Sequence, residues 1–203
     1  MVELRKRKAQ AQAPVTEKRN KKHHNSAVKQ DTREKKPIST TPSEYVPKVG
    51  DTIVLNDFGG QIETNEGRQT TLKDLVENSQ TGVILFTYPK ASTPGCTKQA
   101  CMFGNNFDHL TSTGLSIYGL SADSAKANTT FKTKQSLPYL LLCDPTFTLI
   151  TALGLKKSPK GITRGVFAIN KKGKVLLLQA GGPDGTVEAA RQLVATLAVK
   201  DAE

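Results

Sequence analysis

Short apolar runs alternate with polar, helix-forming stretches over most of the chain after residue 52. Each run holds five or six mostly branched or aromatic residues and is bounded by turn-forming residues. Such runs are typical of strands buried on both faces of a sheet. They predict strands at residues 83–88, 115–120, 139–143, 165–169 and 175–179. The last two flank Asn170-Lys171-Lys172-Gly173, a turn-like sequence that predicts a β-hairpin.

The stretches between these runs predict helices at residues 71–76, 96–110, 124–135 and 185–199. Asp184 is a candidate cap for the last of them. Residues 53–67 predict short strands or a hairpin. The order of strand, helix, strand, helix, hairpin and terminal helix is that of a thioredoxin-like α/β fold. We therefore expect a central mixed β-sheet flanked by helices.

Composition divides the chain of 203 residues at about residue 45. Residues 1–45 hold 12 Lys or Arg against 5 Asp or Glu, a net charge of +7 out of +11 for the whole chain, and one aromatic residue. Such a segment cannot bury enough apolar surface to offset its ordering entropy. We expect a disordered basic tail over residues 1–45 and one folded domain over residues 46–203.

The same pattern excludes several classes of protein. No apolar run reaches the roughly 18 residues of a membrane-spanning helix, and no apolar segment follows the N-terminal charges as in a secretory signal. Three cysteines do not form a secreted disulfide framework. A catalytic or redox thiol in a reducing compartment fits this count better.

The candidate chemistry lies where the strand at residues 83–88 meets the next helix. The segment from Pro89 to Cys96 reads Pro-Lys-Ala-Ser-Thr-Pro-Gly-Cys and places Cys96 at a helix start. Unpaired backbone N–H groups and the positive end of the helix dipole stabilise a thiolate there. The Thr93 hydroxyl can turn to the sulfur or to a bound oxygen substrate, and Pro89 would wall one side of the site. A buried structural cysteine is the alternative.

Residues 86–97 resemble the active-site loop of peroxiredoxins, whose motif is Pro-x-x-x-Thr-x-x-Cys. The spacing of Cys96 and Cys101 resembles that of the PrxQ, or bacterioferritin-comigratory, branch. Further similar segments are residues 119–124, 137–139, 143–145 and 163–169. The resemblance covers about residues 47–200, and the basic tail makes the chain most similar to fungal nuclear thiol peroxidases of that branch.

This resemblance implies a role for each matching residue. Cys96 would be the peroxidatic cysteine, which a hydroperoxide oxidises to a sulfenic acid. Thr93 would hydrogen-bond the peroxide, and Pro89 would shield the site from water. Arg164 would stabilise the thiolate and the leaving oxygen. Without the resemblance, a surface charge or a carboxylate partner would be an equally good interpretation of Arg164.

Cys101 would be the resolving cysteine, with a core-facing helix residue as the alternative. Five residues of α-helix give about 7.5 Å of rise and about 140° of rotation. A disulfide needs Cα atoms within about 4.4–6.8 Å and converging Cβ vectors. We therefore expect the first turns of the helix to unwind after Cys96 is oxidised. Gly104 and the adjacent Asn105-Asn106 pair weaken this helix at its middle.

The chain also departs from the family pattern. Many relatives carry Glu in place of Gln99 and Arg in place of Gly104, so an ion pair that steadies the helix or tunes the thiol is missing here. Cys143 stands where serine is common. Its neighbours, residues 140–142, are all leucine, so we interpret Cys143 as a structural residue of a buried strand.

In the tail, residues 5–8 and 18–22 form two basic clusters that resemble a bipartite nuclear import signal. Importin is the expected partner, and the expected location is the nucleus, with the cytoplasm as a second compartment. The same charges would attract nucleic acid nonspecifically. A merely solubilising tail is the alternative.

Together these features predict a thiol peroxidase that reduces hydrogen peroxide or alkyl hydroperoxides and is recycled by thioredoxin. The resemblance also implies a monomer, and no metal, haem or flavin cofactor is expected. Without a membrane-spanning run, no membrane association is expected either. The alternative from another class is a redox-sensing, chromatin-associated interaction module that a Cys96–Cys101 disulfide switches. A thioredoxin-type disulfide reductase fits less well, since the chain has no Cys-x-x-Cys motif.

Overall fold

The structure is a computed structural model that describes residues 45–200, with the side chain of residue 200 excepted. Apart from Tyr45, the tail predicted to be disordered lies outside the described residues.

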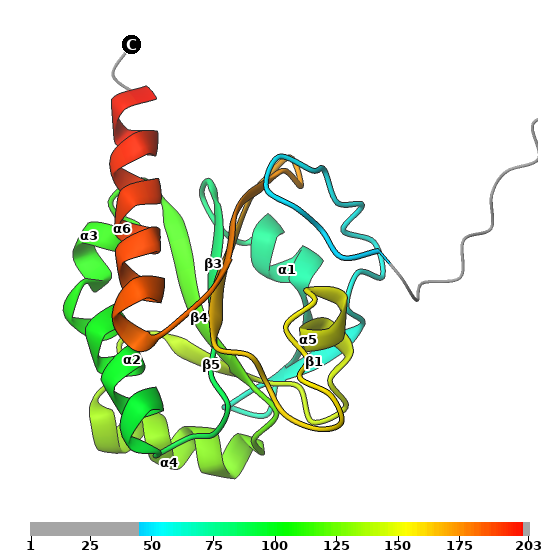
Figure 1. Ribbon diagram of the computed structural model, residues 1–203, viewed down its shortest axis with the longest axis vertical. Coiled ribbons are helices and arrows are strands. Elements are labelled where there is room, and N and C mark those ends of the chain that lie inside the picture. Colours follow the sequence, from blue (N-terminus) through cyan, green and yellow to red (C-terminus); the bar gives the residue numbers. More distant parts are fainter. Residues whose placement is uncertain (1–44, 201–203) are drawn as a thin grey trace, which may run out of the picture. The chain divides into compact units, whose positions relative to one another are not determined.

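Short helices alternate with strands along the described residues (Figure 1). In chain order they are β1 (Gln61–Thr64), β2 (Gln69–Thr71), α1 (Leu72–Glu77), β3 (Gly82–Thr87), α2 (Pro94–Asn105), α3 (Phe107–Thr111), β4 (Leu115–Ser121), α4 (Ala125–Gln135), β5 (Leu140–Cys143), α5 (Thr148–Ala152), β6 (Gly165–Asn170), β7 (Val175–Ala180) and α6 (Pro183–Lys200).

The strands form one sheet of seven in the order β2-β1-β5-β4-β3-β6-β7. The β3–β4 and β4–β5 pairs are parallel, and all other pairs are antiparallel. The expected mixed sheet of a thioredoxin-like fold is therefore confirmed. β3 lies inside the sheet and is buried along its whole length, and the loop that leads to Cys96 follows its carboxyl end.

The sheet separates two apolar cores, as the period-2 geometry of strands requires. On β3, Ile84 and Phe86 face the core beneath α2, α3, α4 and α6, while Val83 and Leu85 face the core beneath α1 and α5. Figure 1 shows these two groups of helices on opposite sides of the strands. No helix within residues 45–200 is long and apolar enough to cross a bilayer.

Several expectations from the sequence need correction. Residues 53–58 form no strand, because Asp57, Gly59 and Gly60 all have positive φ and turn the chain. The hairpin expected within residues 53–67 is confirmed in part, since β1 lies in this range and pairs with β2 just after it. The short helix α5 was not expected at all.

The helix expected at residues 96–110 is broken into α2 and α3 at Asn106. The Asn106 backbone N–H and side-chain amide both donate to the Met102 carbonyl oxygen, at 3.2 Å and 2.8 Å, and the break lies in the non-helical φ of −103° and ψ of 12° at Asn106. The final helix begins at Pro183, so Asp184 lies inside its first turn rather than capping it. Asp184 pairs there with Lys98 of α2 at 2.7 Å.

Candidate functional site

Cys96 occupies the first turn of α2, directly after the loop that leaves β3. Thr93 is the N-cap, with extended backbone angles, and Pro94 is the first helical residue. Proline is well suited to that position because it has no N–H to leave unpaired and its φ is already helical. The Cys96 side chain is 1% exposed and belongs to the core beneath α2. The helix start predicted at about Cys96 is confirmed, with Pro94 as the first helical residue.

Arg164, which immediately precedes β6, reaches the sulfur of Cys96. Its Nη2 atom lies 3.4 Å from Cys96 Sγ, and its Nη1 atom donates to the Gly95 carbonyl oxygen at 3.2 Å. A Cβ atom on Gly95 would lie 3.2 Å from Nη2, so the absence of a side chain makes room for this approach. The structure thus brings together two residues that are 68 positions apart in the sequence.

Gln99, one turn further along α2, contacts the same arginine. Its Oε1 atom accepts from Arg164 Nη1 at 2.7 Å, and its Nε2 atom donates to Thr186 Oγ1 at 3.0 Å. Both Gln99 and Thr186 are 0% exposed. The sequence marked Gln99 only as a departure from the family pattern. Nothing in the sequence pointed to Thr186.

The loop between β3 and α2 is fixed by local hydrogen bonds. Thr93 Oγ1 donates to the Lys90 carbonyl oxygen at 2.9 Å, and the Ala91 backbone N–H donates to Asp123 Oδ2 at 2.7 Å. Ser92 has a φ of 61°, in the left-handed region. Because the Thr93 hydroxyl gives its proton to Lys90, its oxygen keeps free lone pairs and can accept a hydrogen bond. Asp123 lies in a segment that matched the family pattern, but the sequence assigned it no role.

Pro89 lies at the exposed start of this loop, after the buried residue Tyr88. Its expected role in shielding the site from water stays a prediction.

Cys101 lies on the same helix as Cys96 but in different surroundings. It is partly exposed, and its Sγ atom lies 3.5 Å from Gln135 Oε1 of α4. Both cysteines are free thiols in this structure. The preceding residue, Ala100, is buried and its carbonyl oxygen accepts from the Tyr139 hydroxyl at 2.6 Å.

Cys143 lies at the end of β5, 1% exposed, within a separate polar network. The Asn128 side-chain amide donates to its Sγ atom at 3.2 Å, and the Tyr88 hydroxyl donates to Asn128 Oδ1 at 2.8 Å. Burial raises the pKa of both the Cys143 thiol and the Tyr88 hydroxyl. A buried thiol that stays protonated fits the structural interpretation of Cys143.

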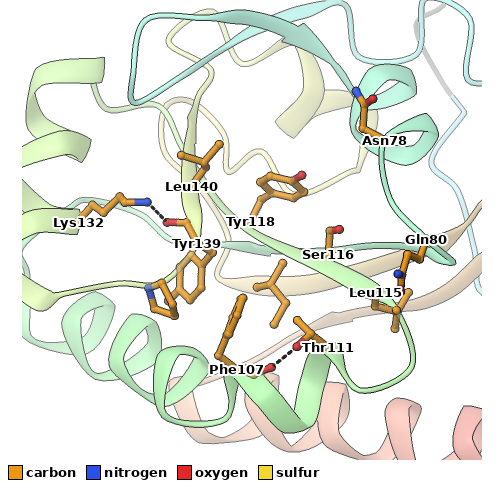
Figure 2. Close-up of a pocket in the computed structure, with 13 residues that line it drawn as sticks. Asn78, Gln80, Phe107, Thr111, Leu115, Ser116, Tyr118, Lys132, Tyr139 and Leu140 are labelled. Atoms are coloured by element: carbon orange, nitrogen blue, oxygen red, sulfur yellow. Dashed lines mark hydrogen bonds between the residues drawn. The ribbon is translucent and has the colours of Figure 1, made fainter.

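A cavity of about 500 Å³ lies between α3, β4 and β5 (Figure 2). Phe107, Tyr118 and Tyr139 line it, and Lys132 donates to the Tyr139 carbonyl oxygen at 2.9 Å. Leu115 and Ser116 at the start of β4 also line it. Because β3 and β4 are parallel, this is the end of the sheet away from Cys96. No cysteine is among its lining residues, so the cavity is distinct from the thiol site.

Two groups meet at the Cys96 sulfur: the positive guanidinium group of Arg164 and the first turn of α2. The Thr93 hydroxyl belongs to the N-cap residue of the same helix. A guanidinium group and a helix N-terminus are donors that an anionic leaving group can use. Within residues 45–200 there is no group of three or more His, Cys, Asp or Glu that could hold a metal ion.

Comparison with known families gives a match over most of the folded unit. The sequence profile of the AhpC/TSA family matches residues 50–177. Peroxiredoxin bcp1 of Schizosaccharomyces pombe is 40% identical over 127 residues, which are 63% of this chain and 62% of that protein. The chain therefore spans less than two thirds of that relative. Peroxiredoxin Bcp of Bacillus subtilis is 31% identical over 134 residues, 63% of this chain and 73% of that protein.

Solved structures give the same result. Peroxidoxin BcpB of Mycobacterium tuberculosis aligns with a TM-score of 0.67 and 27% identity, over 73% of this chain and 97% of that one. A bacterioferritin comigratory protein of Xanthomonas campestris, described for its alkyl peroxide reduction activity, aligns with a TM-score of 0.62 and 26% identity. That alignment covers 75% of this chain and 98% of the Xanthomonas chain.

Proposed function

The chain belongs to the AhpC/TSA family of peroxiredoxins, and on this premise we propose that it is a thiol peroxidase that reduces hydrogen peroxide and alkyl hydroperoxides through Cys96. The observation that carries the proposal is the 3.4 Å contact between Arg164 Nη2 and Cys96 Sγ at the first turn of α2. It gives one thiol of the described domain both a cationic partner and a helix N-terminus.

In the first step, the Cys96 thiolate attacks the terminal oxygen of the hydroperoxide. An S–O bond forms and the O–O bond breaks, so sulfur loses two electrons and Cys96 becomes a sulfenic acid. The other oxygen leaves as an alkoxide or hydroxide and takes a proton from water. The Arg164 guanidinium, already beside the sulfur, stabilises the charge that develops on that leaving oxygen.

Thr93 orients the peroxide in this proposal. Its hydroxyl proton is directed to the Lys90 carbonyl oxygen, so its oxygen accepts a hydrogen bond from the peroxide O–H. The Ala91–Asp123 hydrogen bond keeps that loop in place. Pro89, at the exposed start of the loop, would limit the access of water.

In the second step, we propose that the Cys101 thiol condenses with the sulfenic acid to form a Cys96–Cys101 disulfide and release water. Both residues lie within α2, where a five-residue separation is too long and wrongly directed for a disulfide. The helix must therefore unwind between them. Oxidation promotes this, because a neutral sulfenic acid no longer presents the negative charge that Arg164 contacts.

In the third step, a dithiol reductant of the thioredoxin type attacks the disulfide and restores both thiols. Cys101 is the partly exposed sulfur of the pair, which makes it the accessible point of attack. The cycle then balances without a metal, haem or flavin, because peroxide supplies the oxidant and the dithiol supplies two electrons.

The experiment that tests the proposal measures peroxide-dependent NADPH oxidation in the presence of thioredoxin and thioredoxin reductase. We expect turnover by the full chain, none by Cys96→Ser, and wild-type turnover by Cys143→Ser as the matched control. Turnover by Cys96→Ser would refute the mechanism. Stoichiometric oxidation of Cys96 without turnover would favour the redox-sensing alternative instead.

We also propose that the basic clusters at residues 5–8 and 18–22 direct the protein to the nucleus through importin, with nonspecific nucleic acid contact as a second effect of their charge. These clusters lie outside the described residues. Deleting residues 1–45 should reduce nuclear accumulation of a fluorescent fusion and leave peroxidase activity intact. An unchanged distribution would reject the import signal. The monomeric state stays a prediction.

A further inference from the structure

Gln99 is a fully buried polar residue held between the thiol site and α6. Its amide oxygen accepts from Arg164 Nη1 at 2.7 Å, and its amide nitrogen donates to Thr186 Oγ1 at 3.0 Å. The side chain is 0% exposed, so water does not compete for either atom. Both polar ends of one buried side chain are therefore matched to partners from other parts of the chain.

The orientation of this amide is dictated by its partners. A guanidinium group only donates, so the Gln99 oxygen must face Arg164. The Thr186 hydroxyl gives its proton to the Pro183 carbonyl oxygen at 2.9 Å, so its oxygen accepts from the Gln99 amide. A continuous row of hydrogen bonds thus runs from the guanidinium beside Cys96 to the first turn of α6.

Arg164 needs such support because it is long, only partly buried and outside any helix or strand. A free arginine side chain samples many rotamers, and ordering it costs conformational entropy. Here Nη1 is fixed by two acceptors, the Gly95 carbonyl oxygen and Gln99 Oε1, which leaves Nη2 turned toward Cys96 Sγ. The Gln99 contact is the shorter of the two.

We infer that Gln99 is a positioning residue for the proposed peroxidase reaction, on which this inference rests. It holds the Arg164 guanidinium against the Cys96 sulfur and anchors it to α6 through Thr186. Gln99 does not touch the reacting atoms itself. Its contribution is to provide the buried acceptor that keeps Arg164 in the orientation the thiolate requires.

The neighbouring residue provides a matched control. Lys98 also links α2 to α6, through its ion pair with Asp184, but both side chains are more than half exposed. Exposed ion pairs contribute little to stability, and the Lys98 ammonium group bonds to Asp184 rather than to Arg164. Lys98→Ala therefore removes a link between the same two helices without removing the acceptor for the arginine.

The test uses the full chain and two rates at Cys96. One is oxidation by hydrogen peroxide in a single turnover, and the other is alkylation by iodoacetamide, read at Cys96 by peptide mass spectrometry. Gln99→Met keeps the length and volume of the side chain but removes the acceptor. We expect it to lower both rates on the order of tenfold, the effect of losing one hydrogen bond to a charged group.

Gln99→Glu should keep both rates within about threefold of wild type, because a carboxylate still accepts from Arg164. Lys98→Ala should leave both unchanged. If Gln99→Met does not fold, Gln99→Leu replaces it. The inference is overturned if Gln99→Met or Gln99→Leu keeps the wild-type rates. It is also overturned if Gln99→Glu reacts as slowly as these variants.

A double-mutant cycle separates positioning from a general loss of structure. In an Arg164→Leu background, Gln99→Met should change the alkylation rate by less than about twofold, because no guanidinium remains to be positioned. An equal loss in both backgrounds would overturn the inference. Alkylation also tests the inference separately from the proposed function. If the wild-type chain shows no peroxidase activity but its Cys96 alkylation still depends on Gln99, only the proposed function is refuted.

Discussion

The two cysteines of α2 lie five residues apart in one helix, yet their surroundings differ. Cys96 is 1% exposed and has Arg164 at 3.4 Å from its sulfur, whereas Cys101 is partly exposed and has only the 3.5 Å contact with Gln135. The difference suggests that α2 has to serve two conformational states during the reaction. In the proposed cycle, the helix stays folded while Cys96 is a thiolate and unwinds once Cys96 is oxidised.

The two ends of α2 are held to different degrees. Near Cys96, Gln99 and Lys98 bind Thr186 and Asp184 of α6. After Cys101 the helix contains Gly104, which costs about 1 kcal/mol relative to alanine. It then ends at Asn105, and no basic residue lies in its last turn. We therefore predict that the proposed unwinding starts from the end that carries Cys101.

The largest expected effect comes from removing Cys101, the proposed resolving cysteine. Cys101→Ser should leave the first oxidation of Cys96 within about twofold of wild type, since Cys101 makes no contact with Arg164. It should abolish repeated turnover with thioredoxin and expose Cys96 to sulfinic acid formation. The measurement is peroxide consumption followed by mass spectrometry of the Cys96 peptide. Sustained turnover, with Cys96 protected from overoxidation, would show that another group resolves the sulfenic acid.

A second substitution removes the positive charge of Arg164 beside Cys96. Arg164→Gln should lower the rate of the first oxidation by on the order of 100-fold, as expected for losing a preorganised donor to a leaving oxygen. Stopped-flow measurement of Cys96 oxidation gives this rate directly. Arg191→Gln is the matched control, because Arg191 is an exposed α6 residue paired with Glu188. A loss of less than about threefold for Arg164→Gln would contradict the assigned role.

A smaller effect is expected on the rate of disulfide formation, which one substitution should raise rather than lower. Tyr139→Phe removes the hydroxyl that donates to the Ala100 carbonyl oxygen, and so loosens α2 between the two cysteines. One such bond contributes about 1 kcal/mol, so disulfide formation should accelerate about fivefold while the chain loses that much stability. Rapid-quench measurement of the disulfide tests this, with Tyr118→Phe in the same cavity as control. An unchanged or slower rate would mean that unwinding of α2 does not limit this step.

The sequence predicted the parts of the fold that depend on local pattern. The buried run of β3, the hairpin of β6 and β7, and the start of α2 at Pro94-Gly95 all follow from apolar period and turn chemistry. The five residues of α5 were too few to give a periodic signal, and their N-cap, Phe147, has a left-handed φ of 60° that no propensity would suggest. The break at Asn106 is a change of backbone angles at one residue, to a φ of −103° and a ψ of 12°, within a stretch that otherwise reads as one helix.

The site was predictable only as far as its motif reached. Cys96 and Thr93 lie in one loop, so their proximity follows from the sequence alone. Arg164 had to be taken from the family resemblance, because 68 residues separate it from Cys96. Gln99 and Thr186 are 87 residues apart, and their contact depends on how α6 packs against α2. The role of Asp184 was predicted wrongly because its partner, Lys98 of α2, is 86 residues away and cannot be identified from the local sequence.

The most direct test of the account treats the full chain with one equivalent of peroxide, maps the disulfide by mass spectrometry and measures amide hydrogen exchange. We predict a Cys96–Cys101 disulfide, together with loss of protection across α2 and unchanged protection of β3. A Cys96–Cys143 disulfide would contradict the choice of resolving cysteine. A Cys96–Cys101 disulfide with α2 still protected would contradict the claim that α2 is folded while Cys96 is a thiolate and unwinds after Cys96 is oxidised.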